Sequence, residues 1–333
     1  MKTIIIAEAG VNHNGKIDLA LKLVDCAAKA KADFVKFQTY STEDLVQKNL
    51  SLATYQKKNV KKIYSQNQLL KKYELSENDH YEIIKRCKIK KINFLSSPFD
   101  IKSINFLKKL KLNTLKIPSG EITNIPYLKK IASLNKKIIL STGMASLEEI
   151  KKAIKILIAY GTNKKNIIVL HCSTEYPASI ENLNLLSISY LKKKLNIETG
   201  YSDHSLGLQA SFVAVALGAK VIEKHFTLNR KLSGPDHKAS LLPSELNKLT
   251  KGIRLIEKML GSSRKKPYKA ELANIKYVRK YIVARNHIYK GQKFSEKNIT
   301  TKRSKIGVSA AEWDKVIGKK SKFNFIPEEN VKI

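Results

Sequence analysis

Ionisable side chains gather in the stretch from Val221 to Ser240, which reads VIEKHFTLNRKLSGPDHKAS. It opens with an apolar run typical of a buried β-strand. Glu223 and His225 alternate on that run, so both face the same side of the sheet. Asp236 and His237 follow in the next loop. Carboxylates and imidazoles delivered by a rigid strand can bind a metal ion or move protons, so we predict a reaction centre at the end of this strand.

Comparable polar residues stand where other apolar runs of the chain end. Active sites of α/β barrels lie at the C-terminal ends of their strands, which makes these residues one candidate constellation. The set comprises Glu8, Lys36, Gln38, Ser97, Lys116, Ser119, Glu121, Ser141, Thr174, Tyr176, Ser202 and His204.

Two histidines in this set suggest a metal site. A single histidine near an apolar strand is more often a hydrogen-bonded core residue than a ligand. His204 and His225 are expected on adjacent strands, which lie about 4.8 Å apart, and this proximity favours a divalent metal. Two nitrogen ligands leave positions open for water and substrate, as suits a Lewis acid such as Mn²⁺.

Two lysines have two interpretations. Lys36 and Lys116 could form ion pairs with Glu8 or Glu223 inside the barrel, or they could form a cradle for phosphate and carboxylate with the serines around them. The cradle is favoured, because buried ion pairs are weak reasons for retaining charge.

Other polar residues have a structural interpretation. His171 and Cys172 are adjacent on a strand and point to opposite faces, so they do not form a nucleophile pair. His237 is either a loop ligand or solvated. Residues 12–14, Asn-His-Asn, fit a structural role in a turn as well as they fit a functional role.

The elements that must position these residues alternate between short β-branched runs and amphipathic helical stretches, a pattern that indicates a (β/α)8 TIM barrel. We expect strands at 3–9, 33–39, 93–99, 114–120, 137–143, 166–172, 197–203 and 220–227. Helices are expected at 17–31, 77–90, 101–111, 126–135, 146–161, 185–195, 207–218 and 243–261. Residues 41–75 interrupt this rhythm and are interpreted as a long insertion at the barrel mouth that acts as a lid.

The alternation of strand and helix patterns ends after Gly261. We therefore expect a barrel domain over 1–262, a charged linker over 263–279 and a small β-rich domain over 280–333. A domain of that size is marginally stable alone, so a partner surface is expected.

Composition restricts the class of protein. The net charge is +35, and 56 of the 63 basic residues are lysine, in short runs along the expected helices. Nucleic-acid surfaces usually add arginine and aromatics, so solvated helix faces are favoured and no nucleic acid is expected. The apolar runs are too short to span a bilayer and no signal peptide is visible, which favours a cytoplasmic protein without a membrane partner. Cys26, Cys87 and Cys172 are expected to be reduced.

Nine motifs together resemble one family. In chain order they are IAEAGVNHNG, VKFQT, SSPFD, KIPSGEITNIPYL, ILSTGMAS, LHCSTEYPA, GYSDHS, EKHFT and SGPDHKAS. They resemble the sialic acid synthases, which comprise N-acetylneuraminate synthase and the legionaminate and pseudaminate synthases. The stretch KGQKFSEKNITTKR resembles that family's C-terminal antifreeze-like (SAF) domain.

The resemblance implies a reaction. Phosphoenolpyruvate would condense with a 2-acetamido aldose, and C–O cleavage would release phosphate and a nine-carbon 2-keto-3-deoxy acid. The expected acceptor is N-acetylmannosamine. The alternative is a 2,4-diacetamido-2,4,6-trideoxyhexose, used by legionaminate or pseudaminate synthases.

The resemblance also implies roles for residues. His204 and His225 would bind Mn²⁺ or Mg²⁺, and Glu121 would transfer protons. A domain-swapped homodimer would bring Arg303 of one subunit to the acyl group of the sugar bound by the other. Thr174 stands where some relatives have an asparagine that contacts the substrate. The residues implied to bind phosphoenolpyruvate are Lys36, Lys116, Ser97, Ser119, Ser141 and Ser202. Those implied to bind the sugar are Glu8, Gln38, Tyr176 and Asp236.

Three other functions compete with this interpretation. A Schiff-base barrel aldolase would use Lys36, Lys116 or Lys224 as its nucleophile. A nucleic-acid-binding protein would bind with a steep salt dependence. An ice-binding protein would act through residues 280–333 alone. The last two do not need a ring of polar residues at strand ends, and all three rank below the synthase.

Overall fold

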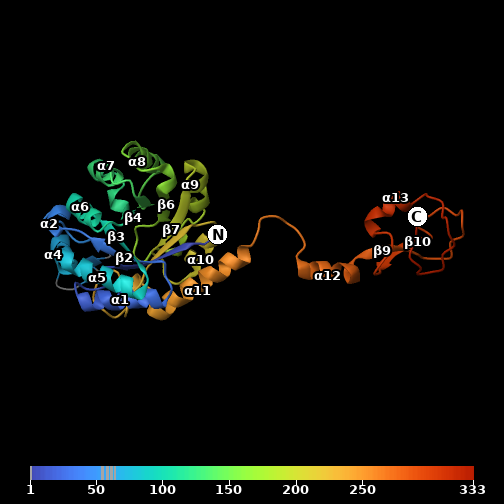
Figure 1. The fold of residues 1–333 in the computed structure, drawn as a ribbon, viewed down its shortest axis with the longest axis horizontal. Coiled ribbons are helices and arrows are strands. Elements are labelled where there is room, and N and C mark those ends of the chain that lie inside the picture. The colour runs from blue at the N-terminus through green and yellow to red at the C-terminus, as the bar shows by residue number, and fades with distance from the viewer. Residues whose placement is uncertain (1, 54–55, 58–59, 61–62, 64) are drawn as a thin grey trace. The chain divides into compact units, whose positions relative to one another are not determined.

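The structure is a computed structural model that describes residues 2–53, 56–57, 60, 63 and 65–333. The chain divides into two compact units, residues 1–261 and 262–333. The two units are described separately below (Figure 1).

Eight parallel strands form the sheet of the first unit. Ladders join them in the order β3-β2-β1-β8-β7-β6-β5-β4, and β3 and β4 at the two ends of this order lie in contact, which nearly closes the sheet. This confirms the predicted TIM-type barrel. The strands are β1 Ile4–Gly10, β2 Phe34–Thr39, β3 Asn93–Pro98, β4 Thr114–Ile117, β5 Lys137–Ser141, β6 Ile167–Cys172, β7 Glu198–Asp203 and β8 Val221–His225.

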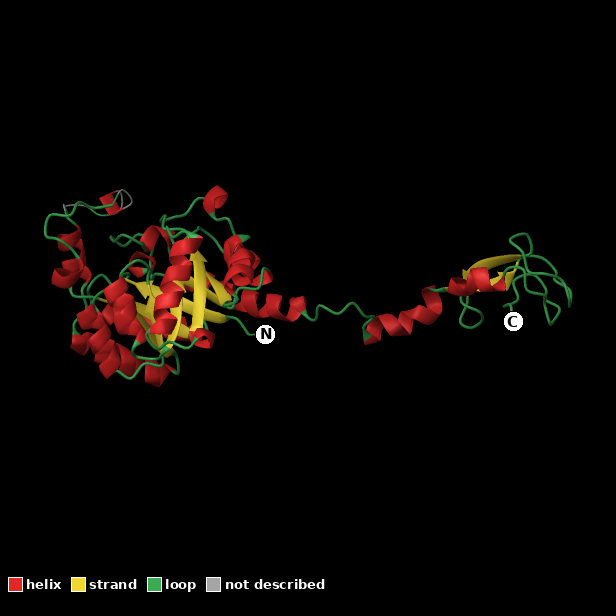
Figure 2. Ribbon diagram, turned by 90° about the horizontal axis from the view of Figure 1, so that it is seen from above, coloured by secondary structure: helices red, strands yellow, loops and turns green. Residues whose placement is uncertain are grey.

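Helices surround this sheet (Figure 2). Two of them begin with capping boxes, in which Ser76 pairs with Asp79 and Ser146 with Glu149, so their first amide groups are satisfied. The helices that follow the strands are α1 Ile17–Lys29, α5 Glu77–Lys90, α6 Ile101–Lys109, α7 Ile125–Ala132, α8 Leu147–Ala159, α9 Ser187–Leu195, α10 Gln209–Ala216 and α11 Pro243–Leu260.

The core of the first unit has an inner and an outer part. Alternate strand residues point inward and fill the barrel, while the others pack beneath the helices. The inner cluster is formed by Ile6, Leu95, Ile139, Leu170 and Val221. This inner cluster fills the barrel below the carboxyl ends of the strands, so those ends are available for polar residues.

Four strands end earlier than the sequence predicts, β3 by a single residue at Pro98 and three others by two or three residues. β4 ends at Ile117, and Ser119–Glu121 forms a short 3-10 helix, η1. Pro118 lacks an amide hydrogen and cannot continue the ladder. β5 ends at Ser141 and β8 at His225. The residues beyond these strands therefore belong to loops, where polar side chains are free to face a ligand.

The insertion between β2 and α5 contains α2, Thr42–Leu45, and α4, Gln66–Tyr73. It has a small apolar cluster of its own, formed by Val11, Leu52, Val60, Leu69 and Tyr73. Part of the predicted lid, residues 54–55, 58–59, 61–62 and 64, lies outside the described residues.

The second unit has an antiparallel pair of strands, β9 Lys280–Ala284 and β10 Ile299–Arg303, and a short helix α13, Trp313–Val316. Its core is formed by eight buried side chains: Ile282, Ala284, Ile288, Phe294, Ile299, Val316, Phe325 and Val331. The segment predicted as a charged linker contains a helix, α12 Lys269–Val278. None of the residues of α12 is buried.

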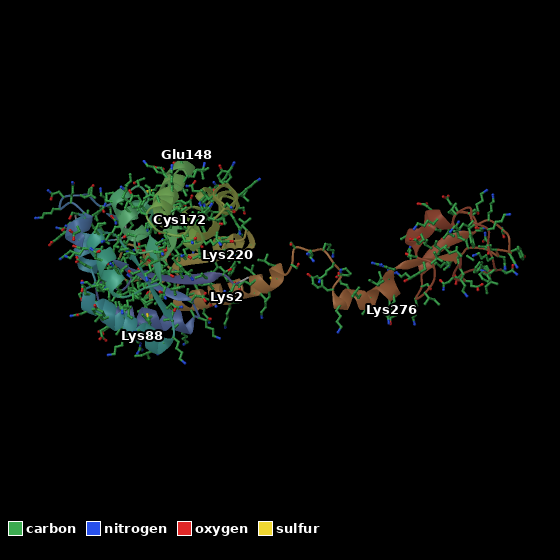
Figure 3. All side chains as sticks on the ribbon, turned by 45° about the horizontal axis from the view of Figure 1, so that its top comes forward. Lys2, Lys88, Glu148, Cys172, Lys220 and Lys276 are labelled. Carbon is green, nitrogen blue, oxygen red and sulfur yellow. The ribbon has the colours of Figure 1, made fainter. Side chains whose placement is uncertain are left out.

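Lysine side chains cover the surface. Lys88 and Lys276 project outward from the ribbon (Figure 3). Of the lysines that the structure describes, only Lys36, Lys116 and Lys224 are buried. These three need a chemical explanation.

Candidate active site

A cavity of about 420 Å³ opens at the carboxyl ends of the barrel strands. Fourteen of the fifteen site residues predicted from the sequence line it. They are Glu8, Lys36, Gln38, Ser97, Lys116, Ser119, Glu121, Ser141, Thr174, Tyr176, Ser202, His204, His225 and Asp236. The fifteenth, Arg303, is exposed on β10 of the second unit.

Four buried charged groups form the centre of the cavity. The Lys36 ammonium lies 3.0 Å from Glu8 Oε2 and 3.7 Å from Glu223 Oε1. Lys116 lies 3.6 Å from the same oxygen of Glu223. Glu223 therefore contacts both lysines, whereas Glu8 contacts one. The ion-pair interpretation of the lysines is confirmed. The paired ammonium groups also line the cavity, as the cradle interpretation requires.

The pKa values of the two carboxyls move in opposite directions. Burial raises the pKa of Glu8 to about 8, although Lys36 acts against it. Burial would also raise the pKa of Glu223, but Lys116 and Lys36 outweigh it and lower that pKa to about 2. Glu223 is thus the ionised partner of the lysines, and Glu8 can carry a proton near neutral pH.

Burial and the neighbouring carboxylates also act in opposite directions on the pKa values of the two lysines. Burial lowers the pKa of Lys116 despite Glu223. Burial acts the same way on Lys36, but the carboxylates of Glu223 and Glu8 outweigh it and raise its pKa. Lys36 is therefore a fixed positive charge on the cavity wall.

Serine hydroxyls complete this wall. Lys36 donates to Ser97 Oγ at 3.1 Å, and Lys116 donates to Ser141 Oγ at 2.6 Å. Ser202 Oγ donates to Glu223 Oε1 at 3.0 Å. Ammonium and hydroxyl donors on one wall are what an oxyanion needs, so this part of the cavity suits a phosphate or a carboxylate.

A glycine keeps the neighbouring loop close to these serines. The amide of Gly143 donates to Ser119 Oγ at 3.0 Å. A Cβ at Gly143 would lie 2.2 Å from Thr174 Oγ1, so no larger residue fits without moving the loop. Ser119 and Thr174, which follow different strands, therefore meet at one point of the cavity.

His204 and His225 lie together, with ring centroids 5.7 Å apart. His204 Nδ1 faces the carbonyl oxygen of Ser173, which can only accept, so Nδ1 is the protonated nitrogen. Nε2 therefore carries the lone pair, and it lies 3.4 Å from Ser202 Oγ. Burial lowers the pKa of His204 to about 4 and that of His225 well below its usual value, so both rings are neutral at pH 7.

These histidines fit a divalent metal with two nitrogen ligands. His225 Nδ1 is buried and has no hydrogen-bond partner among the described residues. In that same part of the chain, no group of three or more His, Cys, Asp or Glu could hold a metal ion. Two neutral imidazoles would leave the remaining coordination positions to water and substrate oxygens.

The remaining predicted residues line the wider part of the cavity. The ring of Tyr176 packs against His204 at 4.2 Å between centroids. Glu121 Oε2 accepts from Asn124 Nδ2, and burial raises the pKa of this carboxyl. Burial raises the pKa of Asp236 to about 7. A carboxyl whose pKa lies near 7, such as that of Asp236, can supply or take a proton near neutral pH.

Several polar residues near the strand ends stay outside the cavity. His171 Nε2 donates to the Leu183 carbonyl, as expected of a hydrogen-bonded core histidine. The Asn12 amide donates to the carbonyl of Phe226, a residue distant in sequence, and not to its own turn. His237 Nδ1 bonds Thr227 Oγ1, so this histidine is neither solvated nor a cavity ligand.

Lys224 was one of three candidates for a Schiff-base nucleophile, and this assignment is wrong. Its ammonium lies 2.8 Å from Asp203 Oδ2 and donates to the Ser205 carbonyl, and Lys224 does not line the cavity. Alternation explains the error, because Lys224 lies between Glu223 and His225 and faces the helices.

Strand parity placed Glu223 beside His225 at the predicted reaction centre, but sequence reasoning gave Glu223 no role in the reaction. Sequence reasoning missed Tyr73, which also lines the cavity. Tyr73 comes from α4, far along the chain from any strand end, and only its place in the insertion hinted at it. Among the described residues, no helix is long and apolar enough to cross a membrane.

Comparison with known proteins places this site in a family. Residues 23–265 match the NeuB family model, and residues 279–328 match the SAF domain. The chain belongs to the NeuB family. It is a phosphoenolpyruvate-condensing synthase, a transferase, and the enzymes of this family depend on a metal and use an acetamido sugar.

Individual relatives cover nearly the whole chain. The N,N'-diacetyllegionaminic acid synthase of Campylobacter jejuni is 50% identical over 331 residues, 99% of both chains. The enzyme of the same name from Legionella pneumophila is 43% identical over 97% of this chain and 92% of its own. The crystal structure of N-acetylneuraminic acid synthetase from Leptospira borgpetersenii in complex with citrate is 38% identical, with a TM-score of 0.75, and covers 83% of this chain and 91% of its own.

Proposed function

We propose that this NeuB-family enzyme is an N,N'-diacetyllegionaminate synthase, which condenses phosphoenolpyruvate with 2,4-diacetamido-2,4,6-trideoxymannose. The 50% identity to a synthase of that name, over 99% of both chains, carries the proposal. The 38% identity to the neuraminic acid synthetase is the weaker match, so the proposal takes the alternative acceptor of the sequence analysis over N-acetylmannosamine.

The lysine and serine wall would bind phosphoenolpyruvate. Its three negative charges would meet Lys36 and Lys116, while Ser97, Ser119, Ser141 and Ser202 would donate hydrogen bonds to its phosphate and carboxylate oxygens. These donors are fixed before the substrate arrives, so little reorganisation opposes the reaction. Glu8 would be protonated, which spares the anion a second nearby negative charge.

The reaction makes one C–C bond and breaks one C–O bond. The methylene carbon of phosphoenolpyruvate attacks the sugar aldehyde, water adds to C2, and the bond from C2 to the phosphate oxygen breaks. Glu121 would take the proton of this water. Glu8, Gln38, Thr174, Tyr176 and Asp236 would orient the open-chain sugar.

His204 and His225 would bind the divalent metal, Mn²⁺ or Mg²⁺. A metal at this place supplies Lewis-acid polarisation of the aldehyde oxygen. Ser173 supports the site by holding His204 in the tautomer that presents Nε2.

Arg303 would act in a domain-swapped homodimer, reaching the sugar bound by the partner subunit. Two observations support this: Arg303 is exposed, and α12 exposes the apolar side chains Leu272, Tyr277 and Val278. Mixing the inactive variants Arg303→Ala and His225→Ala tests it. Hybrid dimers should regain activity at one site, whereas a monomer in light scattering or a mixture without activity would contradict the role in trans.

The acceptor is tested by phosphate release from phosphoenolpyruvate with Mn²⁺ and each of three sugars. These are N-acetylmannosamine, 2,4-diacetamido-2,4,6-trideoxymannose and its altrose counterpart. We expect the highest kcat/KM with the second sugar and no release by His225→Ala. Preference for N-acetylmannosamine would make the enzyme an N-acetylneuraminate synthase, and release by the histidine variant would remove the metal assignment.

A further inference from the structure

Helix α4 is held firmly at the cavity. A Cβ at Gly15, whose φ is +69°, would lie 2.2 Å from the Lys72 carbonyl oxygen, so the first βα loop and α4 touch through backbone alone. Tyr40 Oη donates to the Leu70 carbonyl at 3.1 Å, and Thr42 Oγ1 donates to Glu74 at the end of the helix. The last turn of α4 therefore has a defined place on the cavity wall.

Tyr73, the last residue of α4, carries a hydroxyl without a structural role. The side chain lines the cavity and is only 2% exposed, yet its Oη has no hydrogen-bond partner among the described residues. Its ring belongs to the apolar cluster of the insertion. A phenylalanine would pack there without burying an unsatisfied polar group, so the hydroxyl calls for a ligand.

Asp236 is a second buried polar residue that lines the same cavity as Tyr73. Burial raises the pKa of Tyr73, and the charge of Asp236 raises it further. A Cβ at Gly234 would lie 2.6 Å from the ring of His237, which bonds Thr227 and Asn14, so this loop is fixed too. Burial raises the pKa of the Asp236 carboxyl to about 7, and no hydrogen bond or countercharge from a described residue acts against it.

Apolar side chains from the insertion line the same cavity as these two groups. They are Leu45, Leu50, Leu69 and Leu70. The insertion thus contributes the Tyr73 hydroxyl and four leucines to the cavity, and the loop after β8 contributes the Asp236 carboxyl.

An acetamido group has the complementary chemistry: one N–H donor, one carbonyl acceptor and a methyl group. We propose that Tyr73 and Asp236, framed by the leucines of the insertion, form the subsite for the second acetamido group of the acceptor sugar. Tyr73 Oη donates to its carbonyl, Asp236 accepts from its N–H, and the leucines pack on its methyl group. This inference rests on the proposed diacetamido acceptor and assigns the residues that select it.

Steady-state kinetics of Tyr73→Phe with two sugars tests the subsite. One sugar is 2,4-diacetamido-2,4,6-trideoxymannose, and the other is 2-acetamido-2,6-dideoxymannose, which has a hydroxyl in place of the second acetamido group. The variant should lose roughly tenfold in kcat/KM with the first sugar, through a higher KM for the sugar. It should change little with the second sugar or in the KM for phosphoenolpyruvate.

Tyr201→Phe is the matched control. Tyr201 Oη is also buried without a partner among the residues described, but Tyr201 lies in the outer core and does not line the cavity. This variant should keep the kinetics of the wild type with both sugars. Neither variant should lower Tm, because neither hydroxyl has a hydrogen-bond partner to lose among the described residues.

The outcomes separate the two proposals. Wild-type enzyme that does not prefer the diacetamido sugar overturns the proposed function, and the subsite with it. Wild-type enzyme that prefers this sugar, together with Tyr73→Phe losing equally with both sugars, losing nothing, or melting at a lower Tm, overturns the subsite alone.

Discussion

At the scale of single residues, Glu223 determines the charge of the cavity. Its Oε1 lies within 3.7 Å of both Lys36 and Lys116 and also accepts from Ser202. Without it, two buried ammonium groups would share one carboxyl, Glu8, whose pKa is raised to about 8. Glu223 thus partly neutralises the positive charge of the two lysines before any anion binds. This lowers the free-energy cost of burying the lysines while the cavity holds no anion.

Glu223→Gln should separate binding from turnover. The variant adds one positive charge to the cavity, so the affinity for phosphoenolpyruvate should stay the same or increase. The lysines and Ser202 lose the partner that positions them, so kcat should fall roughly hundredfold. Calorimetry gives the first quantity and phosphate release the second.

Glu148→Gln on the surface of α8 serves as the control and should behave like the wild type. Weaker binding of phosphoenolpyruvate to Glu223→Gln, with kcat unchanged, would contradict this account.

At the scale of elements, β7 and β8 present different chemistry on their two faces. The inward face carries His204 and His225, whereas the outward face carries a buried ion pair between Asp203 and Lys224. Asp203 also accepts from the amide and hydroxyl of Ser205 and from Ser211 on α10. This network ties both strands to a helix directly behind the proposed metal site.

Lys224→Met should reduce the free energy of unfolding by about 3–5 kcal/mol, because it leaves Asp203 buried without its countercharge. Urea unfolding followed by circular dichroism measures the change. Adding Asp203→Leu should recover part of the loss, since no isolated charge then remains.

Lys192→Met, which breaks the exposed pair with Glu198, should cost less than about 1 kcal/mol. An equally small effect at Lys224 would show that the buried pair is replaceable without penalty.

The elements also show how far the sequence could predict the site. Alternation along a strand is a local property, so the shared faces of Lys36 with Gln38 and of Ser202 with His204 were readable from spacing alone. Tyr73 was not readable, because its position depends on how α4 docks against Gly15, a contact between segments distant in sequence. Lys224 was considered as a nucleophile because of its amine, although alternation along β8 places its side chain on the outward face of the strand.

At the scale of the whole molecule, the two units have separate hydrophobic cores. Residues 1–261 hold the cavity, and residues 262–333 hold Arg303. The chain has one tryptophan, Trp313, and it packs on the core of the second unit. Tryptophan fluorescence therefore reports on that unit, while most of the helical signal comes from the barrel.

Unfolding in urea should give two midpoints. The small core of the second unit stabilises few residues, so fluorescence at Trp313 should change at a lower urea concentration than the circular dichroism at 222 nm. Chain 1–261, measured alone, should reproduce the dichroism midpoint. Coincident midpoints in the full chain would show that the two units unfold together.

The insertion lies between β2 and α5, and its described residues contribute no strand to the barrel sheet. Amino-acid replacements in it should therefore leave unaltered the strand register and the groups proposed to bind phosphoenolpyruvate. Evolution can remodel sugar preference in this segment while the donor chemistry is inherited intact, provided that position 15 stays glycine. Because the insertion is separate from the barrel strands, it is a suitable segment to exchange between family members in the laboratory.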